Sequence, residues 1–407
     1  MSFASAESRW SDVYLVAGAR AVSVCGDFLA ATTLTLVLHD AGYGGSAVSG
    51  LMLAATLPPA LLGPIAGRIA DRVDSRTVLV TTGLVQAGVC LLLAYAREPV
   101  LIIALVAVLA CGLAVTQPTQ AALVPELVRR EDLAKASGLT QTAGAIGMLL
   151  APALAGLLVG QAGARLPLLL DAASYLAVVV AGLALHTRRR PGVAAEAAPA
   201  FPWRLRDDPA LTLMAGVLAA VVLGINAVNV VEVFFIRDTL AASTTMFGVV
   251  AASWTAGMLI GGVVFSRVPD RRITMPLLLA VTAASCVVLL GSAAVGSAAW
   301  LIPLWLVGGA GNGGTNVFLM VLVAGRTPAA ARGRAYAAVG AAVQGAGLLG
   351  LLAAGPLVQR FEPRWLMAAS GAAGLLAVVT CMPLVRRESS SPPAVGEPAA
   401  VRDSVGA

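Results

Sequence analysis

The chain has 407 residues, of which 58% are hydrophobic and 43 are glycine, while charged residues make up only 12%. With glycine counted, the apolar share is about 69%, against roughly 45–50% in soluble domains. This composition excludes an ordinary soluble protein, because too few polar side chains are left to cover a water-facing surface of this size. Lipid is expected to cover the rest.

The sequence offers little for metal, nucleotide or enzyme chemistry. Its five cysteines lie in apolar stretches without a CxxC pair, and its two histidines, His39 and His186, have no metal-binding spacing. No GxxxxGK[ST] motif occurs, so an ion gradient rather than ATP is the expected energy source. An enzyme acting on membrane lipid would need clustered acids, histidines or a nucleophile, and the sequence has none. We therefore expect no metal, no cofactor and no enzymatic activity.

Twelve apolar stretches follow one another, each long enough to cross a bilayer as a helix. They cover about residues 13–38, 46–70, 77–95, 100–124, 134–160, 165–186, 210–236, 245–266, 274–294, 299–323, 336–359 and 364–385. The sequence thus predicts an all-α membrane protein with twelve transmembrane helices in two pseudo-symmetric six-helix bundles. The predicted parts are a cytoplasmic N-terminus (1–12), the two bundles (13–186 and 210–385), a cytoplasmic linker (187–209) and a disordered tail (386–407).

The basic residues indicate the orientation, because cytoplasmic loops accumulate Arg and Lys. With both termini in the cytoplasm, 21 of the 27 basic residues lie on the cytoplasmic side, five lie outside, and Arg20 lies within the first helix. This bias explains the net charge of +6 without a nucleic-acid partner. The excess of arginine over lysine is typical of a GC-rich bacterial genome. We expect a monomeric, multi-pass protein of the bacterial cytoplasmic membrane.

The two sets of six helices share a sequence pattern. Near the outer end of the first helix the chain reads LVLHDAG, and at the matching place in the seventh it reads FFIRDTL, which aligns Asp40 with Asp238. The fifth and eleventh helices each carry a proline beside small residues, Pro152 and Pro356. Parallel six-helix repeats suit a transporter that rocks one half against the other around a midplane site.

The loop after the second helix, GRIADRVDSRTVL, resembles the loop between helices 2 and 3 of the major facilitator superfamily. The matching residues are Gly67, Asp71, Arg72, Arg76 and Leu79, whereas Asp74 stands where the general pattern has glycine. The stretches ALVPELVRREDLAKASGL, LLLDAASYLAVVV and VVEVFFIRDTL further resemble the branch of drug:proton antiporters that includes enterobactin exporters and macrolide efflux proteins. The resemblance covers about residues 12–385 and implies export of a small molecule in exchange for protons.

The resemblance also implies a gating role for Asp71. In the family the matching aspartate meets the N-terminus of helix 11 in the outward-facing state, an acid against the positive end of a helix dipole. In this chain that N-terminus is expected near Ala335 and Tyr336. The fourth helix lacks the charged residue that many drug antiporters carry there, which shifts the expected proton coupling toward the first helix.

Asp27, about midway along the first helix, is the main candidate for proton coupling. A carboxylate at the centre of a membrane helix costs roughly 2.5–3.5 kcal/mol on insertion scales, so such a residue is a functional candidate. Arg20 precedes it on the same helix face, about 10 Å away along the axis, close enough to influence its charge. We expect Asp27 to bind the coupling proton or a cationic substrate. The alternative is a static buried carboxylate.

Glu232 in the seventh helix is the second candidate for coupling. Asn226 and Asn229 precede it within about 120° of arc, consistent with one cavity-facing side. Alternatively, Glu232 reaches the outer surface or pairs with Arg237.

Two further titratable residues are expected at the outer surface. Asp171 is expected at the outer rim near Arg165, in a structural role. His39 is either a partner of Asp40 in a proton relay or, as is more usual at a helix end, a solvated group.

The fifth helix carries a stripe of small residues around a proline: Gly147, Ala151, Pro152 and Gly156. Such a stripe allows close helix approach. It resembles the antiporter motif of the superfamily, although Ala151 stands where that motif prefers glycine, and simple helix packing explains it equally well.

Sparse polar residues are expected to line a largely apolar substrate cavity, which suits drug-like molecules. Besides the two asparagines of the seventh helix, they are Gln120, Gln141, Trp254, Asn312, Asn316 and Gln344. The GGAGNGG run at 308–314 matches a dinucleotide-binding pattern only formally, and it is expected to loosen or break its helix instead.

The sequence therefore favours a secondary exporter of small hydrophobic or amphipathic compounds, driven by proton antiport. Uptake or facilitated diffusion of a nutrient by the same fold is the alternative. The expected partners are a small-molecule substrate, protons and the lipid bilayer.

Overall fold

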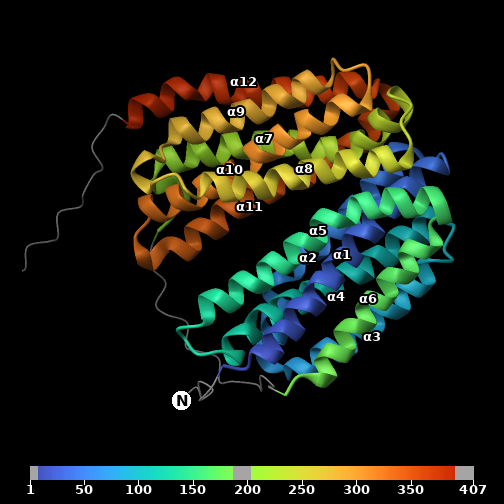
Figure 1. Ribbon diagram of the computed structural model, residues 1–407. Helices are drawn as coiled ribbons and strands as arrows, with labels where there is room; N and C mark the ends of the chain where they lie inside the picture. The colour runs from blue at the N-terminus through green and yellow to red at the C-terminus, as the bar shows by residue number, and fades with distance from the viewer. Residues whose placement is uncertain (1–7, 187–202, 390–407) are drawn as a thin grey trace, which may run out of the picture.

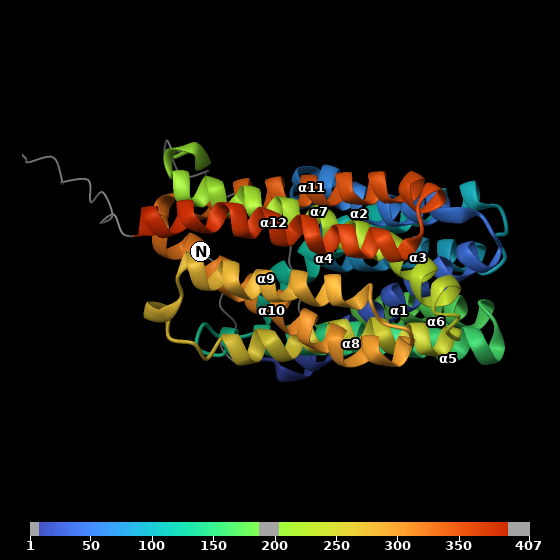
Figure 2. The same cartoon turned by 90° about the horizontal axis from the view of Figure 1, so that it is seen from above.

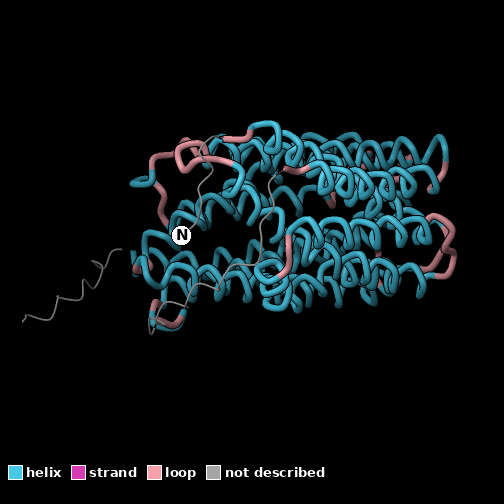
Figure 3. The backbone as a smooth tube through the Cα atoms, turned by 90° about the horizontal axis from the view of Figure 1, so that it is seen from below, coloured by secondary structure: helices cyan, strands magenta, loops and turns pink. Residues whose placement is uncertain are grey.

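The computed structural model describes residues 8–186 and 203–389, and within these residues it contains helices and loops but no strand (Figure 3). The first six long helices are α1 (Trp10–Asp40), α2 (Gly44–Arg72), α3 (Ser75–Leu93), α4 (Pro99–Leu127), α5 (Leu133–Ala162) and α6 (Arg165–Ala184). The second six are α7 (Pro209–Phe234), α8 (Thr244–Phe265), α9 (Met275–Ser292), α10 (Leu301–Arg326), α11 (Arg332–Arg360) and α12 (Pro363–Ser389). One π turn, η2 (Phe235–Thr239), extends α7.

Twelve helices of the described chain are long and apolar enough to cross a membrane, which confirms the predicted fold class. Part of the predicted linker (187–202) and of the predicted tail (390–407) lies outside the described residues, as do residues 1–7. The tail prediction is wrong for residues 386–389, because α12 continues through them to Ser389.

The helices form two bundles that meet at one end and diverge toward the other (Figure 1). Bundle α1–α6 and bundle α7–α12 each consist of helices that run roughly side by side (Figure 2). The described chain begins, and α12 ends, where the bundles diverge. We name this the open end and the opposite side the closed end.

The hydrophobic cores follow the same division. At the closed end one cluster runs through both bundles and includes Leu36, Leu51, Val231 and Leu351. Toward the open end each bundle has a core of its own, such as the one around Leu123 and the one around Phe318. Because van der Waals packing holds membrane helices together, this division stabilises the bundles as separate units joined at the closed end.

Helix α10 is continuous through its glycine run, so the expected loosening or break at 308–314 is wrong. Gly309 and Gly313 of α10 instead face α8. A Cβ on Gly309 would strike the carbonyl oxygen of Trp254, and a Cβ on Gly313 would strike that of Met258. The missing side chains let the two backbones approach closely, and this packing outweighs the low helix propensity of glycine.

Asp74, which departs from the superfamily pattern, has a local role at the start of α3. Its carboxylate accepts hydrogen bonds from the backbone N–H groups of Arg76 (2.9 Å) and Thr77 (3.2 Å). Aspartate is a preferred N-cap because it binds N–H groups that have no partner within the helix. The departure therefore stabilises the start of α3.

Candidate functional site

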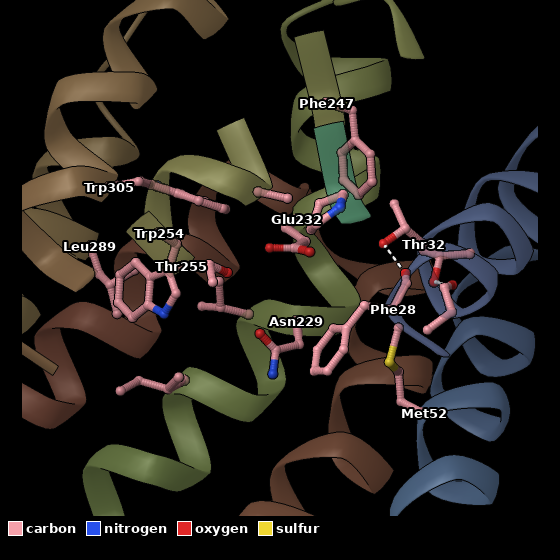
Figure 4. Close-up of a pocket in the computed structure, with 16 residues that line it drawn as sticks. Phe28, Thr32, Met52, Asn229, Glu232, Phe247, Trp254, Thr255, Leu289 and Trp305 are labelled. Atoms are coloured by element: carbon pink, nitrogen blue, oxygen red, sulfur yellow. Dashed lines mark hydrogen bonds between the residues drawn. The ribbon is translucent and has the colours of Figure 1, made fainter. Parts of the chain in front are cut away.

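A central cavity of about 240 Å³ lies between the two bundles (Figure 4). Four aromatic side chains, Phe28, Phe247, Trp254 and Trp305, form much of its wall, and the two indoles pack edge to face with centroids 6.0 Å apart. The other lining residues are Ala31, Thr32, Thr35, Met52, Pro152, Ile225, Val228, Asn229, Glu232, Ala251, Thr255 and Leu289. The cavity is therefore mostly apolar, with few polar groups and one carboxylate.

Glu232 supplies that carboxylate. Figure 4 shows it among the aromatic side chains, and Asn229 lies close by on the same helix. The alternative pairing with Arg237 is not present, because that guanidinium donates to the backbone oxygen of Ala242 (2.7 Å) and to Asp40 (3.2 Å). Within the described chain no basic side chain pairs with Glu232, so its carboxylate is available to a molecule in the cavity.

A second, smaller cavity of about 80 Å³ lies inside the first bundle and holds two acids. We name it the acid pocket; its polar residues are Asp27, Asp171 and Tyr175. The Tyr175 hydroxyl donates to Asp27 over 2.5 Å, while Asp171 accepts from the Cys90 thiol (3.1 Å) and from Ser174 (3.2 Å). Asp171 is only 1% exposed. Two carboxylates in one pocket, each bound by neutral donors, can hold and release a proton.

The expected position of Asp171 at the outer rim is therefore wrong. Arg165, its predicted neighbour, lies instead over the ring of Tyr95, 5.4 Å from the centroid. Tyr175 was missed by the sequence reasoning, although a signal was present. It follows Asp171 by four residues, which places both side chains on one face of α6.

The structure does not bring Arg20 and Asp27 together. Arg20 lines a separate cavity of about 390 Å³ between α1, α4 and α5, and this cavity shares no lining residue with the acid pocket. Its guanidinium donates to the side-chain oxygen of Gln141 over 3.2 Å. We name it the arginine pocket, and its lining residues are Val16, Arg20, Gln117, Pro118, Gln120, Ala121, Val124, Ser137, Thr140 and Gln141.

The other predicted cavity residues are dispersed. Asn312 and Asn316 line a cavity of about 50 Å³ inside the second bundle. Asn226 donates to the backbone oxygen of Val222 (3.1 Å), and Gln344 is exposed on α11. Of the residues predicted to line the substrate cavity or to couple transport to protons, only Glu232, Asn229 and Trp254 line the central cavity.

Polar side chains from α1 and from the end of α7 join the two bundles at the closed end. His39 contacts Asp40 through Nδ1 (3.0 Å) and Asp238 through Nε2 (2.9 Å), and Arg237 pairs with Asp40 (3.2 Å). We name these four residues the latch. Ionised carboxylates only accept hydrogen bonds, so both contacts of His39 are complete when both ring nitrogens carry a proton. His39 is thus a bridging residue and not the solvated group expected from its position.

Replacing His39 with alanine is expected to loosen the closed end, because it removes a contact that crosses from one bundle to the other. Ion pairs with exposed partners contribute about 0–1 kcal/mol, so the fraction of molecules open at this end should rise by up to about fivefold. Distances between spin labels placed across the closed end would measure this change. His186→Ala, at the open end, is the matched control, and an equal response of both variants would contradict the role of the latch.

The small-residue stripe of α5 has two packing roles. Gly147 faces α1, where a Cβ would lie 3.0 Å from the backbone nitrogen of Cys25. Gly156 faces α8 of the other bundle, where a Cβ would lie 3.1 Å from the Cα of Gly248. Ala151 is fully buried, and Pro152 lines the central cavity. The stripe therefore packs both within its bundle and across the bundle interface.

The gating loop lies at the open end, between α2 and α3. Asp71 belongs to the last turn of α2 and Arg72 is exposed, while the guanidinium of Arg76 donates to the backbone oxygen of Leu183. A Cβ on Gly67 would meet no atom within 4 Å. The contact of Asp71 with the start of α11 stays a prediction for the state in which the open end has closed.

The model of the Major Facilitator Superfamily matches the chain twice, over residues 16–230 and 212–404. The chain belongs to the major facilitator superfamily. The superfamily assignment thus agrees with the loop at 67–79 and with the repeated halves. It also supports a membrane transporter rather than an enzyme. A comparison with curated protein sequences finds no significant match.

Solved structures of other transporters share the superfamily fold. The chain is similar to a mutant form of the nucleoside transporter NupG, at 14% identity and a TM-score of 0.76, over 92% of this chain and 99% of that one. It is also similar to a bacterial homologue of the iron transporter ferroportin in an inward-facing state, at 17% identity and a TM-score of 0.74, over 95% and 100% of the two chains. A bacterial homologue of the human lysosomal transporter Spinster, inward-facing and occupied, gives 13% identity, a TM-score of 0.74, and coverage of 96% and 100%. At these identities the likeness concerns the fold alone.

Proposed function

We propose that the protein is a secondary exporter of small amphipathic compounds, driven by proton antiport in the bacterial cytoplasmic membrane with both termini in the cytoplasm. The observation that carries the proposal is the central cavity, in which an unpaired carboxylate, Glu232, lies among four aromatic side chains. Such a cavity binds an apolar molecule by burial of its surface. A positively charged group on that molecule would be stabilised by electrostatic attraction to the carboxylate and by cation–π contact with the aromatic faces.

The open end is compatible with the proposed direction of transport, although an importer also passes through a state open to the cytoplasm. With the termini in the cytoplasm, the divergent side of the bundles faces the cytoplasm, where a compound to be exported enters. The central cavity then lies beneath the packed closed end, as a state loaded from inside requires. A conformational change to a state that is open on the outer side would then release the compound outside the cell.

The acid pocket is the proposed proton site. Asp27 lies on α1, which also contributes Phe28 and Thr32 to the central cavity, so the two sites share a helix. Protonation changes the charge of the pocket, and a shift of α1 would couple this change to the central cavity. The proton and the substrate would thus act on different carboxylates.

Replacing Glu232 with glutamine is expected to reduce transport of an organic cation at least tenfold, because it removes the charge without changing the side-chain volume. The measurement is uptake of tetraphenylphosphonium into inside-out vesicles under an imposed proton gradient. Asn316→Asp, which lies outside the central cavity, is the control that changes charge elsewhere in the second bundle. Transport that needs no proton gradient would favour the alternative, a facilitator of the same fold.

A further inference from the structure

The arginine pocket contains a positive charge without an acidic partner. Arg20 lies ten residues after the start of α1, about 15 Å along the helix axis. None of the residues that line its cavity is acidic. Its guanidinium bonds to the amide of Gln141, and its Nε is buried without a hydrogen-bond partner in the described chain. A charge at such a depth is costly unless a counter-charge is near.

The pocket is shaped around the guanidinium. A Cβ on Gly144 of α5 would lie 3.0 Å from Arg20 Nε, so the glycine leaves the space that this group occupies. Gln117, Gln120 and Ser137 add amide and hydroxyl donors to the same cavity, whereas the Thr140 hydroxyl donates to the backbone oxygens of Ala136 and Ser137. An arginine guanidinium that lies beside neutral hydrogen-bond donors is an arrangement that binds carboxylate or phosphate oxygens.

The pocket faces the space between the bundles. Gln141 precedes Pro152 by eleven residues, which brings it to within about 20° of the same face of α5. The carbonyl oxygen of Pro152 lies against Gly248 of α8, so this face of α5 points toward the other bundle. The bundles diverge from this contact toward the open end (Figure 1), and Gln141, on this face of α5, is exposed.

We infer that the arginine pocket is a binding site for an organic anion, whose carboxylate or phosphate oxygens accept hydrogen bonds from Arg20, from the neighbouring amides and from the Ser137 hydroxyl. Its volume of about 390 Å³ accommodates a small organic molecule. The inference deepens the proposed function, because it adds a second subsite on the path from the open end to the central cavity. A substrate that carries both a negative and a positive group would bind the negative group in the arginine pocket and the positive group beside Glu232.

Calorimetric titration of the purified full chain with benzoate and with phenyl phosphate tests the site without any proton gradient. We expect binding by the parent chain and at least a tenfold weaker affinity in Arg20→Gln. Arg206→Gln removes the same charge from an exposed position and should bind as the parent does. Gln141→Glu keeps the guanidinium but places a carboxylate beside it, and should also weaken binding at least tenfold. It therefore serves as the second variant if Arg20→Gln does not fold.

Repeating the titration in nanodiscs distinguishes a free anion from a lipid headgroup. If a lipid phosphate occupies the site, phosphatidylglycerol should lower the benzoate affinity relative to phosphatidylcholine, and equal affinities assign the site to a free anion. Absence of anion binding by the parent chain, or equal binding by Arg20→Gln, would overturn the inference. Glu232→Gln should leave benzoate binding intact, so failure of the proposed export and failure of this site are separable.

Discussion

Replacing Gly248 with leucine is expected to abolish transport while the protein still folds and inserts. Gly248 of α8 and Gly156 of α5 lie backbone to backbone at the bundle interface, and a Cβ on Gly248 would lie 3.1 Å from the Cα of Gly156 and would strike the carbonyl oxygen of Pro152. A leucine there can be accommodated only if the bundles separate at the closed end. Overpacking costs typically about 1–3 kcal/mol, which shifts the equilibrium between states by about 5- to 150-fold.

Spin-label distances measure this separation directly. Labels on Arg97→Cys and Gly296→Cys, in a Cys111→Ala background, lie in closed-end loops of the two bundles. Their distance should lengthen in Gly248→Leu. Gly262→Leu is a matched control on the same helix, because a Cβ on Gly262 meets no atom within 4 Å. An unchanged distance in Gly248→Leu would show that the interface tolerates the side chain, and the role assigned to this contact would be wrong.

The sequence predicted the helices and the repeat well because both depend on one-dimensional properties. A span of about 20 apolar residues identifies a membrane helix wherever it packs. The alignment of LVLHDAG with FFIRDTL also placed Asp40 and Asp238 at equivalent positions, and in the structure both belong to the latch. Equivalent residues of the two halves meet where the bundles meet.

The sequence predicted the grouping of polar residues less well, because a helix position does not identify its neighbours. Arg20 and Asp27 share a helix face, as expected, but their difference in depth places them in separate pockets. Asp171 is near the outer end of its helix in the sequence, yet it packs against Cys90 of α3 and is buried. Which face of α6 points inward is decided by packing with α1 and α3, and no local pattern carries that information.

The glycine run of α10 shows the same dependence on packing. Read alone, GGAGNGG has low helix propensity, and a weakened helix is a reasonable prediction. The partner helix α8 supplies the compensation, since its backbone fills the space that side chains on Gly309 and Gly313 would take. Propensity describes an isolated segment, whereas this helix is stabilised by its neighbour.

Replacing Asp27 with asparagine is expected to abolish transport driven by a proton gradient. Asparagine cannot bind and release a proton, but its side-chain oxygen can still accept the hydrogen bond from Tyr175, so the packing of α1 against α6 should be kept. Loss of coupling should leave exchange of labelled for unlabelled tetraphenylphosphonium largely intact, because exchange needs no net proton movement. Both rates would be measured in the same proteoliposomes, with and without a pH gradient.

Asp74→Asn is the matched control, because asparagine caps a helix about as well as aspartate and should leave both rates unchanged. Asp171→Asn then tests which acid of the pocket carries the proton. If the pair shares one proton, either substitution should remove the response to the gradient, whereas a response lost only in Asp27→Asn assigns the proton to the acid bound by Tyr175. Full gradient-driven transport by Asp27→Asn would remove Asp27 from the mechanism. Of the carboxylates that line the central cavity and the acid pocket, only Asp171 and Glu232 would then be left to carry the proton.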